Sequence, residues 1–146
     1  MGIEVPLKEL VAAFNRGSLD VPANFFTPRT TFVLNGRSYE SILGGSPDDP
    51  LIRLLARGVA GYRTAARALQ YALQRPVVAI ESLAEPDGSG FCIATVRVQG
   101  ELRDSNQPFA AGATLRLGRT NGELTTIEIQ CGEDDLARIA ASRLAK

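Results

Sequence analysis

The segment FCIATVRVQGELRDSNQPFAAGATLRLGRTNGELTTIEIQ, residues 91–130, decides the fold. Apolar and polar residues alternate along most of it, a pattern typical of β-strands that bury one face. Two polar turns divide the segment into three strands, at 91–102, 109–119 and 124–130. With a further strand expected at 77–83, this part of the chain predicts a meander of four long antiparallel strands.

The residues upstream of the strands predict helices. Residues 1–16 place apolar side chains at helical spacing, and Gly17 suits the left-handed conformation that ends a helix. A second, short helix is expected from Ser18 to Phe26. A longer helical stretch runs from Leu51 to Gln74 and is expected to end at Pro76.

Glycines mark two further features of this upstream half. Asn35-Gly36 lies between short apolar runs and predicts a small hairpin, because both turn positions require positive φ. Gly58 and Gly61 form a weak point in the long helical stretch, which allows two helices in place of one.

Helices followed by antiparallel strands are typical of the α+β class. We predict a single domain over 1–146, in which N-terminal helices pack into a curved antiparallel sheet of four long strands plus a small hairpin. A final helix begins with Glu133-Asp134-Asp135. The curved sheet and the helices form a cone, and the cone has room for a cavity.

Composition excludes several kinds of site. The chain has no histidine and only two cysteines, Cys92 and Cys131. Sites that need imidazole or several thiolates therefore cannot be built, and we expect no metal and no cofactor. The 16 basic and 16 acidic residues balance, which argues against a nucleic-acid partner. We see neither a targeting segment nor a membrane span, and we expect a cytoplasmic protein with reduced thiols.

The strand faces predict an interior without acids or bases. One face of the strand at 91–102 carries Cys92, Ala94 and Val96, and the same face of the next strand carries alanines. These small residues leave room either for a ligand or for large helix side chains. Tyr62 is interpreted as a core tyrosine, with a ligand hydrogen-bond donor as the alternative. The candidate lining of a ligand pocket comprises Leu34, Tyr62, Cys92, Ala94, Val96 and Ala113.

Five features of the sequence carry a resemblance to one known family. They are the segment LKELVAAFNRGSLD at 7–20, the pair Phe25-Phe26, the strand before Gly36, the helix GYRTAARALQYAL at 61–73, and the four strands. Together they resemble the nuclear transport factor 2-like superfamily of cone-shaped domains, which includes ketosteroid isomerases and SnoaL-like polyketide cyclases. The resemblance implies a homodimer formed through the outer face of the sheet. That face would be supplied by Thr95, Arg97, Gln99, Thr114, Arg116, Thr126 and Glu128.

The resemblance does not extend to ketosteroid isomerase chemistry. Leu10, Leu34 and Ala113 occupy the positions that match that family's oxyanion-hole tyrosine, catalytic aspartate and protonated aspartic acid. The His-Asp pairs of the related cyclases and dehydratases cannot form without histidine. We therefore expect none of this acid–base machinery.

Three functions stay open. The first is a domain that binds a small apolar ligand inside the cone. The second is a non-catalytic homodimeric module for protein interaction. The third is a cyclase, dehydratase or hydrolase that uses acids the alternation does not identify, with Glu40, Asp48 and Glu81 as the residues to inspect. Whether the chain is an enzyme is therefore left undecided.

Two groups of polar residues allow a plain and a functional interpretation. Arg37 and Tyr39 follow the hairpin turn and are interpreted as surface residues, with gating of a pocket as the alternative. Residues 51–75 contain five arginines and no acid. That segment predicts a solvated helix face or, alternatively, a patch for an anionic ligand or an acidic partner.

Overall fold

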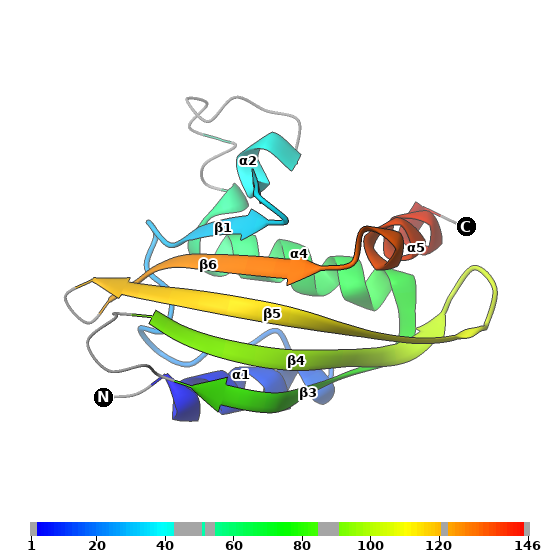
Figure 1. The fold of residues 1–146 in the computed structure, drawn as a ribbon, viewed down its shortest axis with the longest axis horizontal. Helices are drawn as coiled ribbons and strands as arrows, with labels where there is room; N and C mark the ends of the chain where they lie inside the picture. Colours follow the sequence, from blue (N-terminus) through cyan, green and yellow to red (C-terminus); the bar gives the residue numbers. More distant parts are fainter. Residues whose placement is uncertain (1–2, 43–50, 52–54, 85–90, 121–122, 145–146) are drawn as a thin grey trace.

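The computed structural model describes residues 3–42, 51, 55–84, 91–120 and 123–144 (Figure 1). Helices lie on one side of a single curved sheet, and α1 and α4 cross behind it in Figure 1. In chain order the elements are α1 Glu4–Asn15, β1 Thr31–Leu34, β2 Arg37–Ser38, α2 Tyr39–Ile42, α4 Gly58–Ala72, β3 Leu73–Ala84, β4 Phe91–Leu102, β5 Pro108–Thr120, β6 Glu123–Cys131 and α5 Glu133–Leu144.

The sheet has six strands in the order β2-β1-β6-β5-β4-β3. The four long strands pair antiparallel, and the short hairpin β1–β2 extends the sheet beyond β6. The predicted α+β class, with N-terminal helices against a curved sheet of four long strands plus a hairpin, is confirmed. One detail differs from the prediction: β1 runs parallel to β6, so the sheet is mixed rather than wholly antiparallel.

The predicted hairpin turn is confirmed. Asn35 has φ 49° and Gly36 has φ 84°, the pair of positive φ values that a tight two-residue hairpin requires. The turn places β2 and α2 directly after β1, at the end of the sheet that α5 also approaches (Figure 1).

The predicted second helix over 18–26 is wrong. The chain there forms turns, and Asn24 takes a left-handed conformation that a helix does not allow. The Ser18 hydroxyl accepts a hydrogen bond from the Asp20 amide at 3.1 Å, so it stabilises a local turn in place of a helix N-terminus. Phe25 and Phe26 are nevertheless buried, and their rings contact each other edge to face.

The predicted break near Gly58 is confirmed, but Pro76 does not end the helix. Arg57 is extended and Gly58 has φ 62°, so α4 begins only at Gly58. At its other end α4 stops at Ala72, and β3 begins at the next residue. Pro76 lies inside β3, where the pairing register with β4 shifts between Gln74 and Val77. An edge strand tolerates proline at such an irregularity because fewer ladder hydrogen bonds are lost.

The interior contains two clusters of buried residues. The larger cluster joins the apolar face of α1 to β1, β4 and the first half of β6, and it includes Phe26, Phe32 and Tyr39. The smaller cluster lies at the other end of the cone and comprises Ala72, Leu73, Leu102 and Phe109. Within the described ranges, no helix is long and apolar enough to cross a membrane.

Candidate functional site

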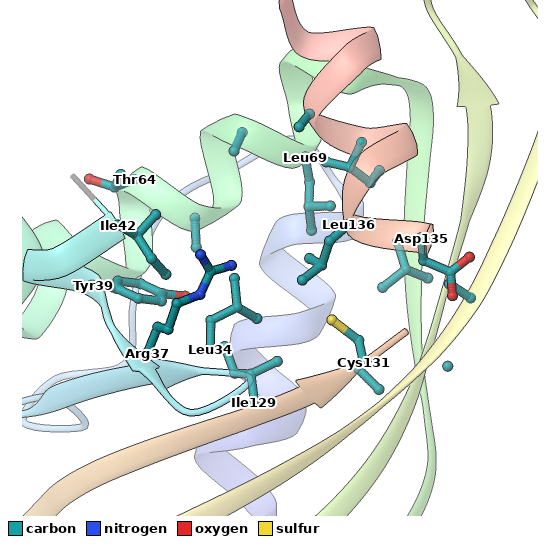
Figure 2. Close-up of a pocket in the computed structure, with 18 of the residues that line it drawn as sticks. Leu34, Arg37, Tyr39, Ile42, Thr64, Leu69, Ile129, Cys131, Asp135 and Leu136 are labelled. Atoms are coloured by element: carbon teal, nitrogen blue, oxygen red, sulfur yellow. The ribbon is translucent and has the colours of Figure 1, made fainter. Parts of the chain in front are cut away.

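A pocket of about 380 Å³ lies between the two buried clusters (Figure 2). The inner face of the sheet forms its floor, and α4, α5 and the β2–α2 segment form its walls. Its lining is mostly aliphatic and comprises Leu34, Arg37, Tyr39, Ile42, Thr64, Ala65, Ala68, Leu69, Val98, Phe109, Ala111, Gly112, Ala113, Ile129, Cys131, Asp135, Leu136, Ile139 and Ala140. Arg37, Ile42 and Thr64 are exposed, so the pocket reaches the surface between β2, α2 and α4.

Small residues on facing elements explain why the space is not filled. Ala111 and Ala113 project from β5, and Ala65 and Ala68 face them from α4. Protein interiors pack closely, so methyl side chains on both walls leave volume that longer side chains would occupy. The sequence allows the small strand residues to make room either for a ligand or for helix side chains. At Ala111 and Ala113 they border open space.

Hydrogen bonds near both ends of α5 hold this helix against the pocket. Near its C-terminus, the buried Ser142 hydroxyl donates to the Ala72 carbonyl at 2.7 Å and accepts the Arg103 amide at 3.0 Å. Ahead of its N-terminus, the Asn35 side chain donates to the Cys131 carbonyl and accepts the Cys131 amide, both at 2.9 Å. The Asn35 side chain also donates to the Glu133 carboxylate. These bonds hold the helix as a fixed wall.

Tyr39 provides a buried polar group at the wall of the pocket. Its side chain is buried, and its ring stacks on Phe32 with centroids 5.0 Å apart. Burial, followed by the influence of Cys131, raises the pKa of the Tyr39 hydroxyl far above its ordinary value. The hydroxyl is therefore neutral at physiological pH and acts as a hydrogen-bond donor or acceptor.

Cys131 places a thiol in the pocket. Figure 2 shows its sulfur directed into the space between Ile129 and Leu136. Burial raises the pKa of this thiol, and the nearby carboxylates of Asp135 and Glu133 raise it further. A thiolate is the reactive form of cysteine, so this environment favours an unreactive, neutral thiol.

Comparisons with known proteins give a structural answer only. No protein-family model matches the sequence, and no curated protein matches it significantly. Solved structures do match: TsrD from Streptomyces laurentii superposes with a TM-score of 0.67 at 14% identity, covering 96% of this chain and 95% of that one. A provisionally assigned SnoaL-like polyketide cyclase from Jannaschia Sp. CCS1 gives 0.64 at 12% identity, covering 97% and 91%. An NTF2-like protein of unknown function from Exiguobacterium gives 0.61 at 15% identity, covering 88% and 99%.

The chain has the nuclear transport factor 2-like (NTF2-like) fold. This confirms the resemblance inferred from the sequence. Structural superposition at 12–15% identity establishes the fold alone. The activity must be argued from the residues of the site.

The NTF2-like cone brings only part of the sequence-predicted lining to the pocket. Leu34 and Ala113 line it. Cys92 and Ala94 are instead packed in the larger buried cluster, where Tyr62 stacks on Phe26 with centroids 5.5 Å apart. Val96 is buried on β4, away from the pocket lining among the described residues.

Of the three acids singled out for inspection, Glu40 and Glu81 do not form a catalytic pair. Glu40 is buried and forms an ion pair with Arg57, 2.9 Å from carboxylate oxygen to guanidinium nitrogen. Glu81 is exposed on β3, and Asp48 lies outside the described residues. In the part of the chain that the structure describes, no group of three or more Cys, Asp or Glu is placed to hold a metal ion.

The pocket includes ionisable residues that were not predicted from the sequence. The predicted interior without acids or bases is wrong for the pocket, which holds Cys131, Tyr39, Arg37 and Asp135. Strand alternation predicts Cys131, because it continues the inward series of Ile127 and Ile129. The surface interpretation of Tyr39 is also wrong, since α2 turns this side chain inward against Phe32.

Proposed function

We propose that this chain binds a small, mostly apolar ligand in the pocket between the sheet and helices α4 and α5. The observation that carries the proposal is the pocket itself: about 380 Å³ of open space with an aliphatic lining and few polar groups. Ligand sites in proteins typically have this character, with volumes of roughly 300–1,000 Å³ and a few placed polar groups.

The ionisable groups of the pocket favour binding over acid–base catalysis. General acid–base catalysis works best with a group whose pKa lies near the working pH. The pKa values of both Tyr39 and Cys131 are raised, so both groups stay protonated. Asp135 is the carboxylate that lines the pocket among the described residues. The alternative of a cyclase, dehydratase or hydrolase would therefore rest on Asp135.

The test uses the neutral fluorophore N-phenyl-1-naphthylamine, whose emission rises when it enters an apolar site. We expect saturable binding to the wild-type protein. Ala113→Phe fills the pocket from β5 and should weaken binding by about tenfold or more, because the aromatic ring takes space the probe needs. Ala110→Phe is the matched control, since Ala110 lies on the exposed face of the same strand.

Two results would overturn this proposal. One is the absence of saturable binding to the wild-type protein. The other is equal binding by Ala113→Phe and Ala110→Phe, which would place the probe on the surface. Circular dichroism of both variants establishes that the comparison is made between folded proteins.

A second proposal is a homodimer formed through the outer face of the sheet. Its support is that this face lies open, with Val77 and Ile93 exposed at 45% and 41%. Arg97 and Arg116 are exposed on the same face, next to Glu128 on β6. Opposite charges on one face can pair across a two-fold axis. Sedimentation velocity at high protein concentration should show a dimer for the wild type and a monomer for Ile93→Glu; a monomeric wild type would contradict the proposal.

The proposed compartment remains the cytoplasm. Cys92 lies on β4 opposite Leu117, and Cys131 lies on β6 opposite Ala113. Strand β5 therefore separates the two thiols, and they do not form a disulfide. Thiols that are not joined in this way suit a reducing compartment.

A further inference from the structure

The polar groups of the pocket are unevenly distributed. Arg37 and Tyr39 lie together at the β2–α2 end, where the pocket opens to the surface. Figure 2 shows Asp135 across the pocket from them, on the first turn of α5. Figure 2 shows the aliphatic side chains of Leu69 and Leu136 in the space beyond, and Ile139 also lines the pocket. A ligand that fills this pocket therefore meets hydrogen-bond donors at one end and hydrocarbon along its length.

Tyr39 presents a hydroxyl that the protein itself does not satisfy. The residue is only 8% exposed, and the stack on Phe32 fixes the direction of its ring. Within the described part of the chain, no hydrogen bond is formed by this hydroxyl. Among the described residues the fully buried side-chain oxygen without a partner is Glu40 Oε1, so the Tyr39 hydroxyl itself keeps contact with the open pocket. A hydroxyl in such a position takes its partner from solvent or from a ligand. The pocket that Tyr39 lines is the place from which a partner would come.

Arg37 adds a charge to the same end. Its guanidinium group points into the pocket in Figure 2, and no carboxylate among the described residues pairs with it. Arginine offers only donors. A guanidinium beside a neutral hydroxyl is therefore a pair of donors that requires an acceptor, and an anionic acceptor gains most from it.

We propose that the pocket takes an amphipathic monocarboxylate, whose carboxylate group binds Arg37 and Tyr39 and whose apolar body extends over Ala113 towards Leu69 and Ile139. The proposal deepens the proposed function and rests on it. Asp135 determines which way the ligand lies in the pocket, because a ligand carboxylate at the α5 end would be repelled by the Asp135 carboxylate.

The experiment compares octanoate with 1-octanol as competitors for bound N-phenyl-1-naphthylamine. The two share one hydrocarbon chain and differ in the charged group. In a purely apolar pocket the alcohol competes better, because a carboxylate loses its hydration without compensation. With Arg37 and Tyr39 as partners, we expect octanoate to compete at a concentration about tenfold lower than 1-octanol.

Two conservative variants connect this preference to the proposed donors. Arg37→Gln and Tyr39→Phe should each remove most of the preference for octanoate over 1-octanol, measured as the ratio of the two competing concentrations within the same variant. Arg97→Gln and Tyr71→Phe are the matched controls at exposed positions, and both should keep the wild-type preference.

The possible outcomes distinguish this proposal from the proposal that the pocket binds a small apolar ligand. If the fluorophore does not bind at all, the pocket proposal has failed, and this one fails with it. If the fluorophore binds but 1-octanol competes as well as octanoate, the pocket binds apolar ligands and the carboxylate assignment is wrong. An unchanged preference in both Arg37→Gln and Tyr39→Phe would likewise overturn the assignment.

Discussion

Two asparagine side chains form the pair of backbone hydrogen bonds that a neighbouring strand would otherwise form. Asn15, at the end of α1, donates to the Val78 carbonyl at 2.9 Å and accepts the Val78 amide at 2.8 Å. Asn35 forms the same pair of bonds with the backbone of Cys131. A side-chain amide has the donor and acceptor of a peptide group. Asn15 therefore satisfies the edge strand β3, and Asn35 fixes the junction between β6 and α5.

Asn35→Ala should lower the free energy of unfolding by about 3 kcal/mol. The variant leaves the amide and the carbonyl of Cys131, which is partly buried, without their side-chain partner. It also places alanine at φ 49°, a left-handed conformation that alanine adopts less readily than asparagine. Asn24→Ala separates these causes, because Asn24 has φ 62° and is exposed. That control should cost only about 1 kcal/mol. Urea denaturation measures both, and equal losses would contradict the role assigned to the Asn35 amide.

The pocket environment should make Cys131 a slow nucleophile. Because the pKa of its thiol is raised, less thiolate exists at a given alkaline pH than in the unfolded chain. Alkylation by iodoacetamide, followed by mass spectrometry, should show a rate that rises with pH along a curve shifted to higher pH than the curve of the urea-unfolded protein. Bound ligand should slow the reaction further. Coincident pH curves for folded and unfolded protein would contradict this description of the site.

At the scale of elements, Gly58 decides where α4 begins. A Cβ atom at this position would lie 2.7 Å from the Thr27 carbonyl oxygen, and its φ of 62° disfavours other residues. The Gly58 amide also donates to the Thr30 carbonyl at 2.9 Å, which joins the start of α4 to the approach of β1. This close contact sets the position of the α4 wall relative to the sheet.

Gly58→Ala should therefore destabilise the protein by about 3 kcal/mol, from backbone strain and displacement of the 27–30 turn. Gly112→Ala is the contrast. A Cβ there would meet only the Val96 carbonyl oxygen, at 3.9 Å, and the backbone φ is not positive. This variant should change stability by less than about 1 kcal/mol. Thermal unfolding followed by circular dichroism compares the two, and a tolerated Gly58→Ala would show that the break does not depend on glycine.

Elements with a strong local pattern were predictable, and elements fixed by distant contacts were not. The strand predicted at 91–102 is β4, because alternation and the flanking turns are local signals. The error at 18–26 arose because capping residues alone do not make a helix when packing favours turns. The parallel pairing of β1 with β6 joins residues about 95 positions apart, and no local pattern encodes it.

The ion-pair partners of the arginine-rich segment at 51–75 also could not be predicted from a local pattern. Residues 51–75 contain no acid, yet Arg57 pairs with the buried Glu40, and Arg75 pairs with Glu101 at 2.7 Å. Arg63 donates to the Leu19 carbonyl. Each partner comes from another part of the chain, so the composition of the segment alone does not reveal it. Fewer of these arginines are therefore free to form the predicted patch for an anion. Arg37 lines the pocket, and no carboxylate of the described residues pairs with it.

At the scale of the molecule, the pocket is a gap between two cores. Strand alternation predicted which residues face inward, but it does not say how far along the cone each one lies. Cys92 and Ala94 therefore face inward into a packed region, whereas Ala113 faces inward into open space. The difference depends on what α4 and α5 place opposite each strand residue, and that is determined by tertiary packing.

The most direct test of the pocket as a ligand site is an NMR titration of ¹³C-labelled alanine methyl groups with N-phenyl-1-naphthylamine. Ala65, Ala68 and Ala113 line the pocket, whereas Ala79 and Ala110 lie on the outer face of the sheet. If the pocket binds the probe, the pocket methyls shift saturably and the outer methyls stay unchanged. Shifts confined to Ala79 and Ala110, or no shifts at the pocket alanines at saturating probe, would contradict it.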